Sequence, residues 1–263
     1  MYTPPRSRVF YPKVAIFIAL LSCGYFIIQK KRSKKLLSKD LSLVLERNIK
    51  KNSSASLKPE KRTSKSAMKR HEKILHEIET KNPDIVFIGD SITRGLEFQK
   101  PTWQEYSYLQ TVNAGISSDR IQHMLFRIES GLFLKSKPKL IVLMAGINNI
   151  TMNSASEIVT GIKLLLDAIQ KQTPESRIVL LGLFPSGRSP EMKVRKKIQN
   201  INRSLSHIQR DNVQFLDIGY RFLTPSGTLT KKISYDGVHL TGKGYKIWQS
   251  AMMPLLRNNS HIF

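Results

Sequence analysis

The sequence predicts an α/β protein with a three-layer, doubly wound sheet of about five parallel strands, preceded by an apolar anchor helix and a basic tether. Short apolar runs alternate with amphipathic segments through the second half of the chain, and no internal repeat is visible. A chain of 263 residues with 40% hydrophobic content can bury one sizeable core. One globular domain with N-terminal appendages therefore accounts for the length.

An apolar run over residues 14–28 (VAIFIALLSCGYFII) has no charged residue and is flanked by Arg and Lys on both sides. It is shorter than the roughly 17–25 residues of a spanning helix, but Phe10, Tyr11 and snorkelling lysines would extend it. A signal peptide is the alternative, although no A-x-A-like cleavage site follows the run. We expect residues 14–29 to be an uncleaved membrane anchor that follows a basic flank at 1–13.

The next segment, residues 30–65, is rich in Lys, Arg and Ser and predicts a solvated tether. The chain carries a net charge of +24, of which +14 lies in residues 1–81. Basic residues beside an apolar run typically contact anionic lipid headgroups, so we interpret this charge as directed at a membrane. No nucleic-acid-binding motif accompanies it, and no nucleic-acid partner is expected. The single cysteine, Cys23, rules out an internal disulfide framework and a cysteine-based metal site.

The flanking charges leave the orientation of the predicted anchor open. The heavier positive charge after the apolar run favours a domain in the cytoplasm, whereas a basic N-terminus followed by an early apolar segment favours export. Of the two, we favour a domain that faces away from the cytoplasm.

The globular domain is expected to span residues 66–263. It should open with a helix over 67–79, where apolar residues recur at helical spacing. Five runs have the length and composition of buried parallel strands: Ile85–Ile88, Thr111–Ala114, Leu140–Ala145, Ile178–Leu183 and Val213–Ile218. Further helices are expected over Ser118–Ser130, Ser154–Gln172, Glu191–Gln209 and Thr241–Leu256, with Ser118, Ser154 and Thr241 as N-caps.

Ligands bind to such sheets at the carboxyl ends of the strands, so chemistry is expected in the loops that follow each run. The first strand is followed by Gly89-Asp90-Ser91, the second by a loop with Gly115, and the third by Gly146-Ile147-Asn148-Asn149. A further element, Asp236-Gly237-Val238-His239, precedes the last helix. Each of these short motifs is common alone, but their order and strand context make the set specific.

These residue types fit nucleophilic catalysis. A serine hydroxyl is a weak nucleophile until a base removes its proton, and the neutral imidazole of His239 can accept that proton from Ser91 near pH 7. Asp236, three residues before the histidine, can hold the imidazole and stabilise its protonated form. Taken singly, Asp236 reads as a turn residue and His239 as an exposed loop histidine.

Attack on an ester carbonyl also requires hydrogen-bond donors for the negative charge that develops on oxygen. Three candidates follow the first three strands: the backbone N–H of Ser91, the backbone N–H of Gly115 and the side-chain amide of Asn148. Alone, Gly115 reads as a turn glycine and Asn148 as a loop-stabilising amide. Their convergence with the triad on one sheet edge favours an oxyanion hole.

With all four motifs in order between Lys81 and Leu256, the sequence resembles the SGNH (GDSL-like) hydrolase superfamily. It is most similar in its motifs to the catalytic subunits of platelet-activating factor acetylhydrolase and their bacterial relatives. The resemblance implies a flavodoxin-like sheet, Ser91 as nucleophile, His239 and Asp236 as the rest of the triad, and Gly115 and Asn148 in the oxyanion hole. It also implies a serine esterase acting on short acyl groups, most often acetyl, carried by a lipid or a glycan.

Several alternatives stay open at this point. The same site would serve a lysophospholipase, a thioesterase or an acyltransferase. From another class, a catalytically silent domain would bind carbohydrate or protein at the membrane, or the basic N-terminal region would be the functional part. No cofactor or metal is expected, because no dinucleotide fingerprint follows the first strand and the histidines lack metal-ligand spacing.

Overall fold

The structure is a computed structural model that describes residues 57–260. The basic flank at 1–13, the predicted anchor at 14–29 and most of the predicted tether lie outside the described residues and stay predictions. Among residues 57–260, no helix is long and apolar enough to cross a membrane. The described residues belong to one compact unit.

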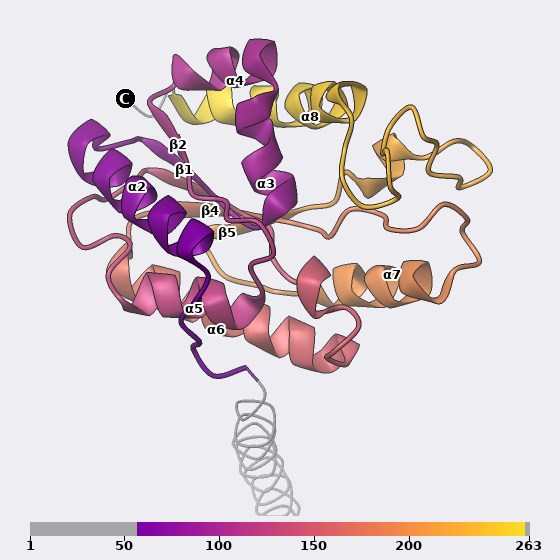
Figure 1. The fold of residues 1–263 in the computed structure, drawn as a ribbon, viewed down its shortest axis with the longest axis horizontal. Coiled ribbons are helices and arrows are strands. Elements are labelled where there is room, and N and C mark those ends of the chain that lie inside the picture. The colour runs from indigo at the N-terminus through magenta and orange to yellow at the C-terminus, as the bar shows by residue number, and fades with distance from the viewer. Residues whose placement is uncertain (1–56, 261–263) are drawn as a thin grey trace, which may run out of the picture. The chain divides into compact units, whose positions relative to one another are not determined.

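Five parallel strands form a single sheet in the order β2-β1-β3-β4-β5, which confirms the predicted doubly wound pattern (Figure 1). β1 has its predicted bounds, and the other four strands begin within one residue of their predicted starts and end one or two residues before their predicted ends. Their bounds are β1 Ile85–Ile88, β2 Thr111–Asn113, β3 Leu140–Leu143, β4 Arg177–Leu181 and β5 Val213–Leu216. In the register, Val86 of β1 pairs with Val112 of β2 on one side and Ile141 of β3 on the other.

Helices cover both faces of the sheet (Figure 1). On one side α5 packs on α6 and α6 on α7, whereas α4 packs against α8 on the other side and α2 contacts the edge strand β2. The helices are α2 Lys65–Lys81, α3 Ser91–Gly95, α4 Lys100–Ser107, α5 Ile121–Glu129, α6 Ala155–Gln172, α7 Lys193–Leu205 and α8 Gly242–Ser260. Three 3₁₀ turns complete the set: η1 Leu96–Phe98, η2 Ile147–Asn149 and η3 Gly219–Phe222.

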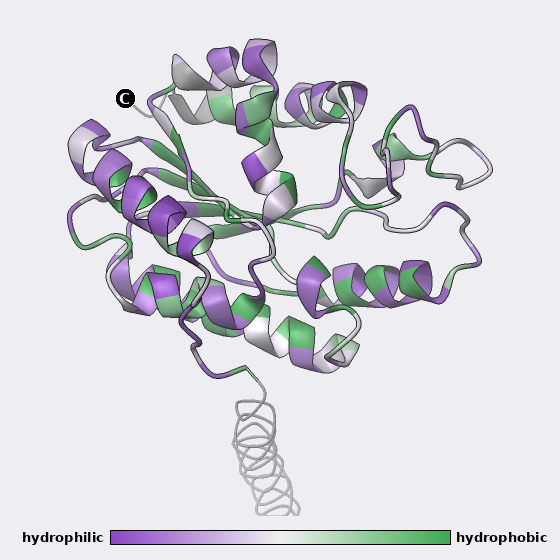
Figure 2. Cartoon of the chain, viewed as in Figure 1, coloured by the Kyte–Doolittle hydropathy of each residue, from purple (hydrophilic) through white to green (hydrophobic). Residues whose placement is uncertain are grey.

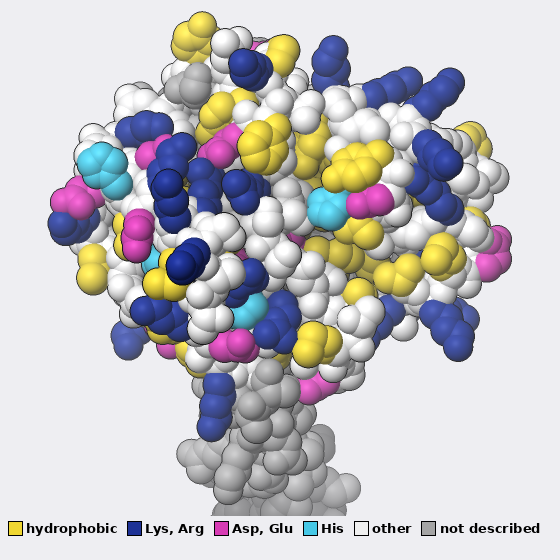
Figure 3. All heavy atoms as spheres, viewed as in Figure 1, with side chains coloured by type: hydrophobic (Ala, Val, Ile, Leu, Met, Phe, Trp, Pro, Cys, Tyr) yellow, Lys and Arg dark blue, Asp and Glu magenta, His cyan; other side chains and the backbone are white. Residues whose placement is uncertain are grey.

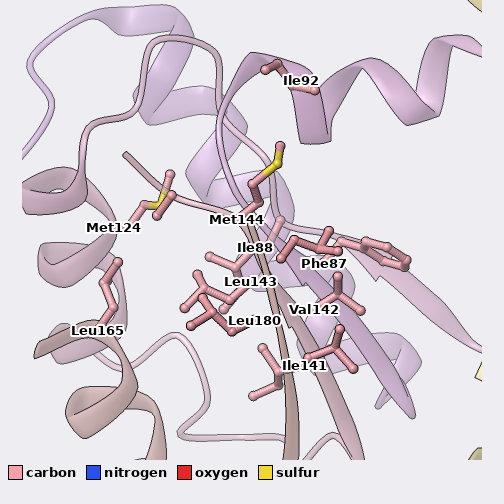
Figure 4. Close-up of a cluster of buried hydrophobic side chains, with 14 of the residues drawn as sticks. Phe87, Ile88, Ile92, Met124, Ile141, Val142, Leu143, Met144, Leu165 and Leu180 are labelled. Carbon is pink, nitrogen blue, oxygen red and sulfur yellow. The ribbon is translucent and has the colours of Figure 1, made fainter. Parts of the chain in front are cut away.

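The hydrophobic core forms around the inner strands of the sheet, which are buried on both faces. Every residue of β1 and β3 is buried, and Figure 2 shows the strands as the most hydrophobic segments, whereas α2 is mainly hydrophilic. Side chains from β1, β3 and β4 meet Met124 of α5 and Leu165 of α6 in one apolar cluster (Figure 4). On the other face, the fully buried Trp248 of α8 lies edge-on to Phe87, with ring centroids 6.4 Å apart. Apolar contact on both faces therefore holds the strands in the middle layer.

Two of the three predicted N-caps are confirmed. The Ser154 hydroxyl accepts the backbone N–H of Glu157 in a capping box, and the Thr241 hydroxyl accepts the backbone N–H of Gly244. The prediction for Ser118 is wrong, because α5 begins three residues later at Ile121. Ser118 has a φ of +63°, a left-handed conformation that cannot start a helix.

Residues 57–64, which the sequence analysis placed in the tether, pack on the domain in the structure; we call them the strap. Leu57 is only 1% exposed, and a Cβ added to Gly161 of α6 would lie 2.7 Å from its Cδ1. The backbone N–H of Glu60 donates to the Gln122 carbonyl of α5. A single apolar residue among lysines shows no periodicity, which explains why the sequence did not reveal this contact. The packed part of the chain therefore begins at least nine residues before residue 66.

We predict that Leu57→Ala lowers the free energy of unfolding by about 2–4 kcal/mol, because the change empties a buried site between α5 and α6. Urea unfolding followed by tryptophan fluorescence measures this loss. Leu134→Ala is the matched control, since Leu134 is largely exposed and its truncation should cost under about 0.5 kcal/mol. Equal, small effects of the two changes would show that Leu57 does not belong to the core.

Candidate active site

The serine proposed as nucleophile lies where β1 turns sharply into α3. Ser91 is the first residue of α3, and Asp90 caps this helix by accepting the backbone N–H of Ile92 at 2.9 Å. The turn requires Gly89, because a Cβ there would lie 2.0 Å from the Thr93 hydroxyl. As the first helical residue, Ser91 has a backbone N–H with no acceptor inside the helix, and its hydroxyl lies at the carboxyl end of β1.

The structure brings the histidine and the aspartate to this serine. The Nε2 atom of His239 lies 2.8 Å from the Ser91 hydroxyl oxygen, across a sequence separation of 148 residues. The Nδ1 atom of the same ring lies 2.6 Å from Oδ2 of Asp236. The other carboxylate oxygen of Asp236 accepts the backbone N–H groups of Val238 and His239, at 2.8 and 2.7 Å. The three side chains thus form a continuous chain of hydrogen bonds.

These contacts set the charge of Asp236. Its partial burial acts to raise the pKa of the carboxyl group, but hydrogen bonds from the His239 side chain and from two backbone N–H groups outweigh burial. The net result is a pKa below the usual range, so the carboxylate stays ionised at neutral pH. An ionised carboxylate favours the tautomer of His239 that carries its proton on Nδ1 and leaves Nε2 free to accept.

Arg188, which the sequence analysis did not single out, fixes the loop that carries both residues. Its Nη1 atom donates to the Ser234 carbonyl at 2.6 Å, and its Nη2 atom donates to the Tyr235 carbonyl at 2.8 Å. At Gly237, where φ is +90°, the chain makes the tight turn between the aspartate and the histidine. No sequence pattern links Arg188 to this loop, because they meet only in the folded chain.

Tyr235 is a second residue that the sequence did not indicate. Its ring stacks on the His239 imidazole with centroids 5.7 Å apart and an interplanar angle of 12°. The tyrosine ring is 61% exposed and therefore covers one face of the imidazole at the surface.

Gly115 and Asn148 follow β2 and β3, the two neighbours of β1. The backbone N–H of Gly115 donates to Oδ1 of Asn113 at 2.9 Å, so its single hydrogen already has an acceptor within the protein. The Nδ2 atom of Asn148 donates to the Asp119 carbonyl at 2.9 Å, and a primary amide has a second hydrogen to offer. A Cβ at Gly115 would lie 2.5 Å from the backbone N of Arg94, so the close approach of this loop to α3 requires glycine.

The remaining charged groups do not form a metal site. Among residues 57–260, no group of three or more His, Cys, Asp or Glu side chains could hold a metal ion. A hollow of about 480 Å³ lies at the amino ends of β3 and β4, between Lys137–Leu140 and Thr173–Arg177, opposite to the edge that carries Ser91. The candidate site is therefore defined by side-chain geometry at the carboxyl edge of the sheet.

Comparison with known proteins identifies the family of the chain. The model of the GDSL-like lipase/acylhydrolase family matches residues 87–247. The alpha2 subunit of platelet-activating factor acetylhydrolase IB from Rattus norvegicus is 35% identical over 181 residues, which cover 68% of this chain and 78% of the relative. The alpha1 subunit from the same organism is 34% identical over 183 residues, which cover 68% and 77%.

Solved structures share the fold. A GDSL-like lipase from Bacteroides thetaiotaomicron superposes with a TM-score of 0.61 and 19% identity, covering 73% of this chain and 98% of that one. A mutant of an acetylxylan esterase from Geobacillus stearothermophilus gives a TM-score of 0.51 and 19% identity, covering 65% and 93%. Fold and relatives together define an α/β acylhydrolase. The chain belongs to the GDSL-like lipase/acylhydrolase family.

The nucleophile turn contains a buried acid whose ionisation should tune stability. Asp90 is fully buried, and its Oδ2 atom has no hydrogen-bond partner. Burial raises the pKa of this carboxyl group to about 7, with the nearby Asp119 acting in the same direction. A raised pKa favours the protonated acid in the folded state. Its contribution to stability is present below the unfolded-state pKa near 4 and is lost as the pH rises through about 7.

We predict that the stability of the wild type relative to Asp90→Asn falls by roughly 2–3 kcal/mol between pH 5 and pH 8, because asparagine cannot ionise. Urea unfolding of both proteins at the two pH values measures the difference. A constant offset between the two proteins would show that Asp90 is already ionised at pH 5.

Proposed function

We propose that the chain is a serine esterase that hydrolyses carboxylic esters through an acyl-enzyme, with Ser91 as nucleophile. The observation that carries the proposal is the pair of hydrogen-bond distances at His239: 2.8 Å to the Ser91 hydroxyl and 2.6 Å to Asp236. In this arrangement His239 takes the serine proton as the hydroxyl attacks the ester carbonyl. It then protonates the leaving alcohol and activates water to release the acyl group.

The negative charge on the tetrahedral intermediate needs donors at the same sheet edge. The backbone N–H of Ser91, at the amino end of α3, and the second amide hydrogen of Asn148 supply two of them. Gly115 contributes a third if its N–H shares its hydrogen between Asn113 and the substrate oxygen. Removal of one such donor typically lowers kcat by about 10²–10³.

For the substrate, we propose short acyl groups, acetyl above all, on a lipid or a glycan. Two kinds of similar protein support this choice: the acetylhydrolase subunits act on platelet-activating factor, and the structural neighbour is an acetylxylan esterase. These activities belong to those proteins, and their shared feature is an acetyl ester.

We further propose that the enzyme works at a membrane surface, held by residues 14–28. Supporting this, the apolar run is followed by a basic segment, and Lys and Arg side chains are also scattered over the described face in Figure 3. A positively charged segment is drawn toward anionic surfaces, and this attraction is worth about 1 kcal/mol per basic residue close to the bilayer where the segment faces the cytoplasmic leaflet. We propose that the domain faces away from the cytoplasm.

Replacing Ser91 with Ala should abolish hydrolysis of p-nitrophenyl acetate and labelling by a fluorophosphonate, because the nucleophilic oxygen is removed. Ser204→Ala, at an exposed position of α7, is the matched control and should keep full activity. Residual hydrolysis by Ser91→Ala above roughly a tenth of the wild-type rate, with labelling retained, would assign the nucleophile elsewhere.

The acyl preference can be measured with p-nitrophenyl esters of two to eight carbons. We expect kcat/KM to be highest for acetate and to fall as the chain lengthens. A maximum at six or eight carbons would contradict the acetyl proposal and favour a lysophospholipase or thioesterase.

A further inference from the structure

The strap contacts the loop that precedes α5, and this loop lies between the strap and the candidate active site. In Figure 1 the segment ahead of α2 runs along α5 and α6. Leu57 is buried between α5 and α6, and the carboxylate of Glu60 pairs with Arg120 at 3.3 Å. These contacts fix the path of the strap across the carboxyl edge of the sheet, where β2 leads into α5.

Arg62 makes the contact that reaches furthest toward the site. Its Nη1 atom donates to the Ser118 carbonyl at 2.8 Å and lies 3.8 Å from Oδ1 of Asp119. Ser118 is held in a left-handed conformation with φ of +63°, which costs a non-glycine residue energy. A hydrogen bond to its carbonyl helps to maintain this conformation.

Asp119 connects the loop to the candidate active site, because it contacts both Arg62 and Asn148. Its carboxylate is completely buried, and Oδ2 accepts from Nε of the buried Arg127 at 3.0 Å. Oδ1 has no hydrogen-bond partner, which leaves Arg62 as the cation that faces it. Burial of Asp119 raises the pKa of its carboxyl group, whereas Arg127 and Arg62 act to lower it. Each of the two arginines therefore faces a different oxygen of the Asp119 carboxylate.

The backbone of the same residue holds Asn148. The Asp119 carbonyl accepts one hydrogen of the Asn148 amide at 2.9 Å, which fixes the rotation of the amide group. Because the amide is planar, the direction of its second hydrogen is then also fixed. A donor to a developing oxyanion must be held in place before the reaction, and small displacements of such groups are costly to the rate.

We infer that Arg62 is a positioning residue of the esterase: by holding Ser118 and Asp119, it orients the Asn148 amide toward the oxyanion. This inference rests on the proposed function, in which Asn148 stabilises the tetrahedral intermediate. Arg62 precedes residues 87–247, the region matched by the family model.

The test uses the full chain and compares Arg62→Gln with the wild type on p-nitrophenyl acetate. We expect Arg62→Gln to lower kcat by roughly tenfold, a part of the 10²–10³-fold effect of removing a donor, with little change in KM. Lys58→Gln is the matched control, because it removes the same charge from an exposed position of the strap and should leave kcat unchanged. Arg62→Lys, which keeps a cation near Asp119, should recover part of the lost rate.

A double-mutant cycle with Asn148→Ala separates positioning from general loosening. If Arg62 acts through Asn148, Arg62→Gln should have no further effect on kcat in the Asn148→Ala background. Equal losses in both backgrounds, or no loss in the wild-type background, would overturn the inference. Thermal unfolding of each variant shows whether the domain is intact, and Arg62→Lys serves in the cycle if Arg62→Gln does not fold.

The proposed function fails in a different way from the inference. Full activity in Ser91→Ala would refute the esterase mechanism itself. If the variant Asn148→Ala, with Ser91 unchanged, has normal activity, then Asn148 is not part of the oxyanion hole. The role assigned to Arg62 would then also be refuted. A large effect of Asn148→Ala with none of Arg62→Gln would leave the esterase in place and refute the positioning role alone.

Discussion

The hydrogen bond between Ser91 and His239 joins two loops that are far apart in the sequence, and most of the described structure serves to hold those loops at one edge of the sheet. Parallel pairing of β1 with β2 and β3 sets the carboxyl ends of the three strands side by side. Packing of α8 through Trp248 onto Phe87 fixes the start of that helix, and therefore the loop that carries His239. A shift of either element would separate the two atoms, since a hydrogen bond tolerates only a few tenths of an ångström.

Polar contacts make the final adjustment. Arg188 fixes the carbonyl groups of the loop around Asp236, and the Asp90 carboxyl closes the turn that carries Ser91. The apolar core thus selects the fold, while buried polar groups place individual atoms. This division explains how solved structures that are only 19% identical to this chain share its fold: many apolar side chains can build the same layers.

The sequence predicted the sheet and singled out Ser91, Asp236 and His239, which the structure brings within hydrogen-bond distance, because both leave local signals. Apolar runs of four to six residues mark buried strands, and the Gly89-Asp90-Ser91 turn and the Asp236–His239 spacing are contiguous in the chain. The sequence did not predict the strap, because a single side chain, Leu57, buries it. It did not predict the roles of Arg188 and Tyr235, because their contacts with the His239 loop form only in the folded chain. Ser118 was predicted as a helix cap because a serine before an amphipathic run favours one. Its left-handed backbone, whose carbonyl accepts a hydrogen bond from the distant Arg62, leaves no local signal.

Tyr235 has a consequence for the handedness of the ligands that the site accepts. Its ring covers one face of the His239 imidazole, so a leaving group that takes a proton from Nε2 meets an aromatic surface on one side. In the proposed mechanism, a reagent with a stereogenic phosphorus atom places its leaving group near His239 and its oxygen near the candidate donors of Ser91 and Asn148. Its two remaining substituents then lie in unequal surroundings. Mirror-image forms of such a reagent should therefore inactivate the enzyme at different rates, and the covered face of the histidine makes the site chiral well beyond the serine itself.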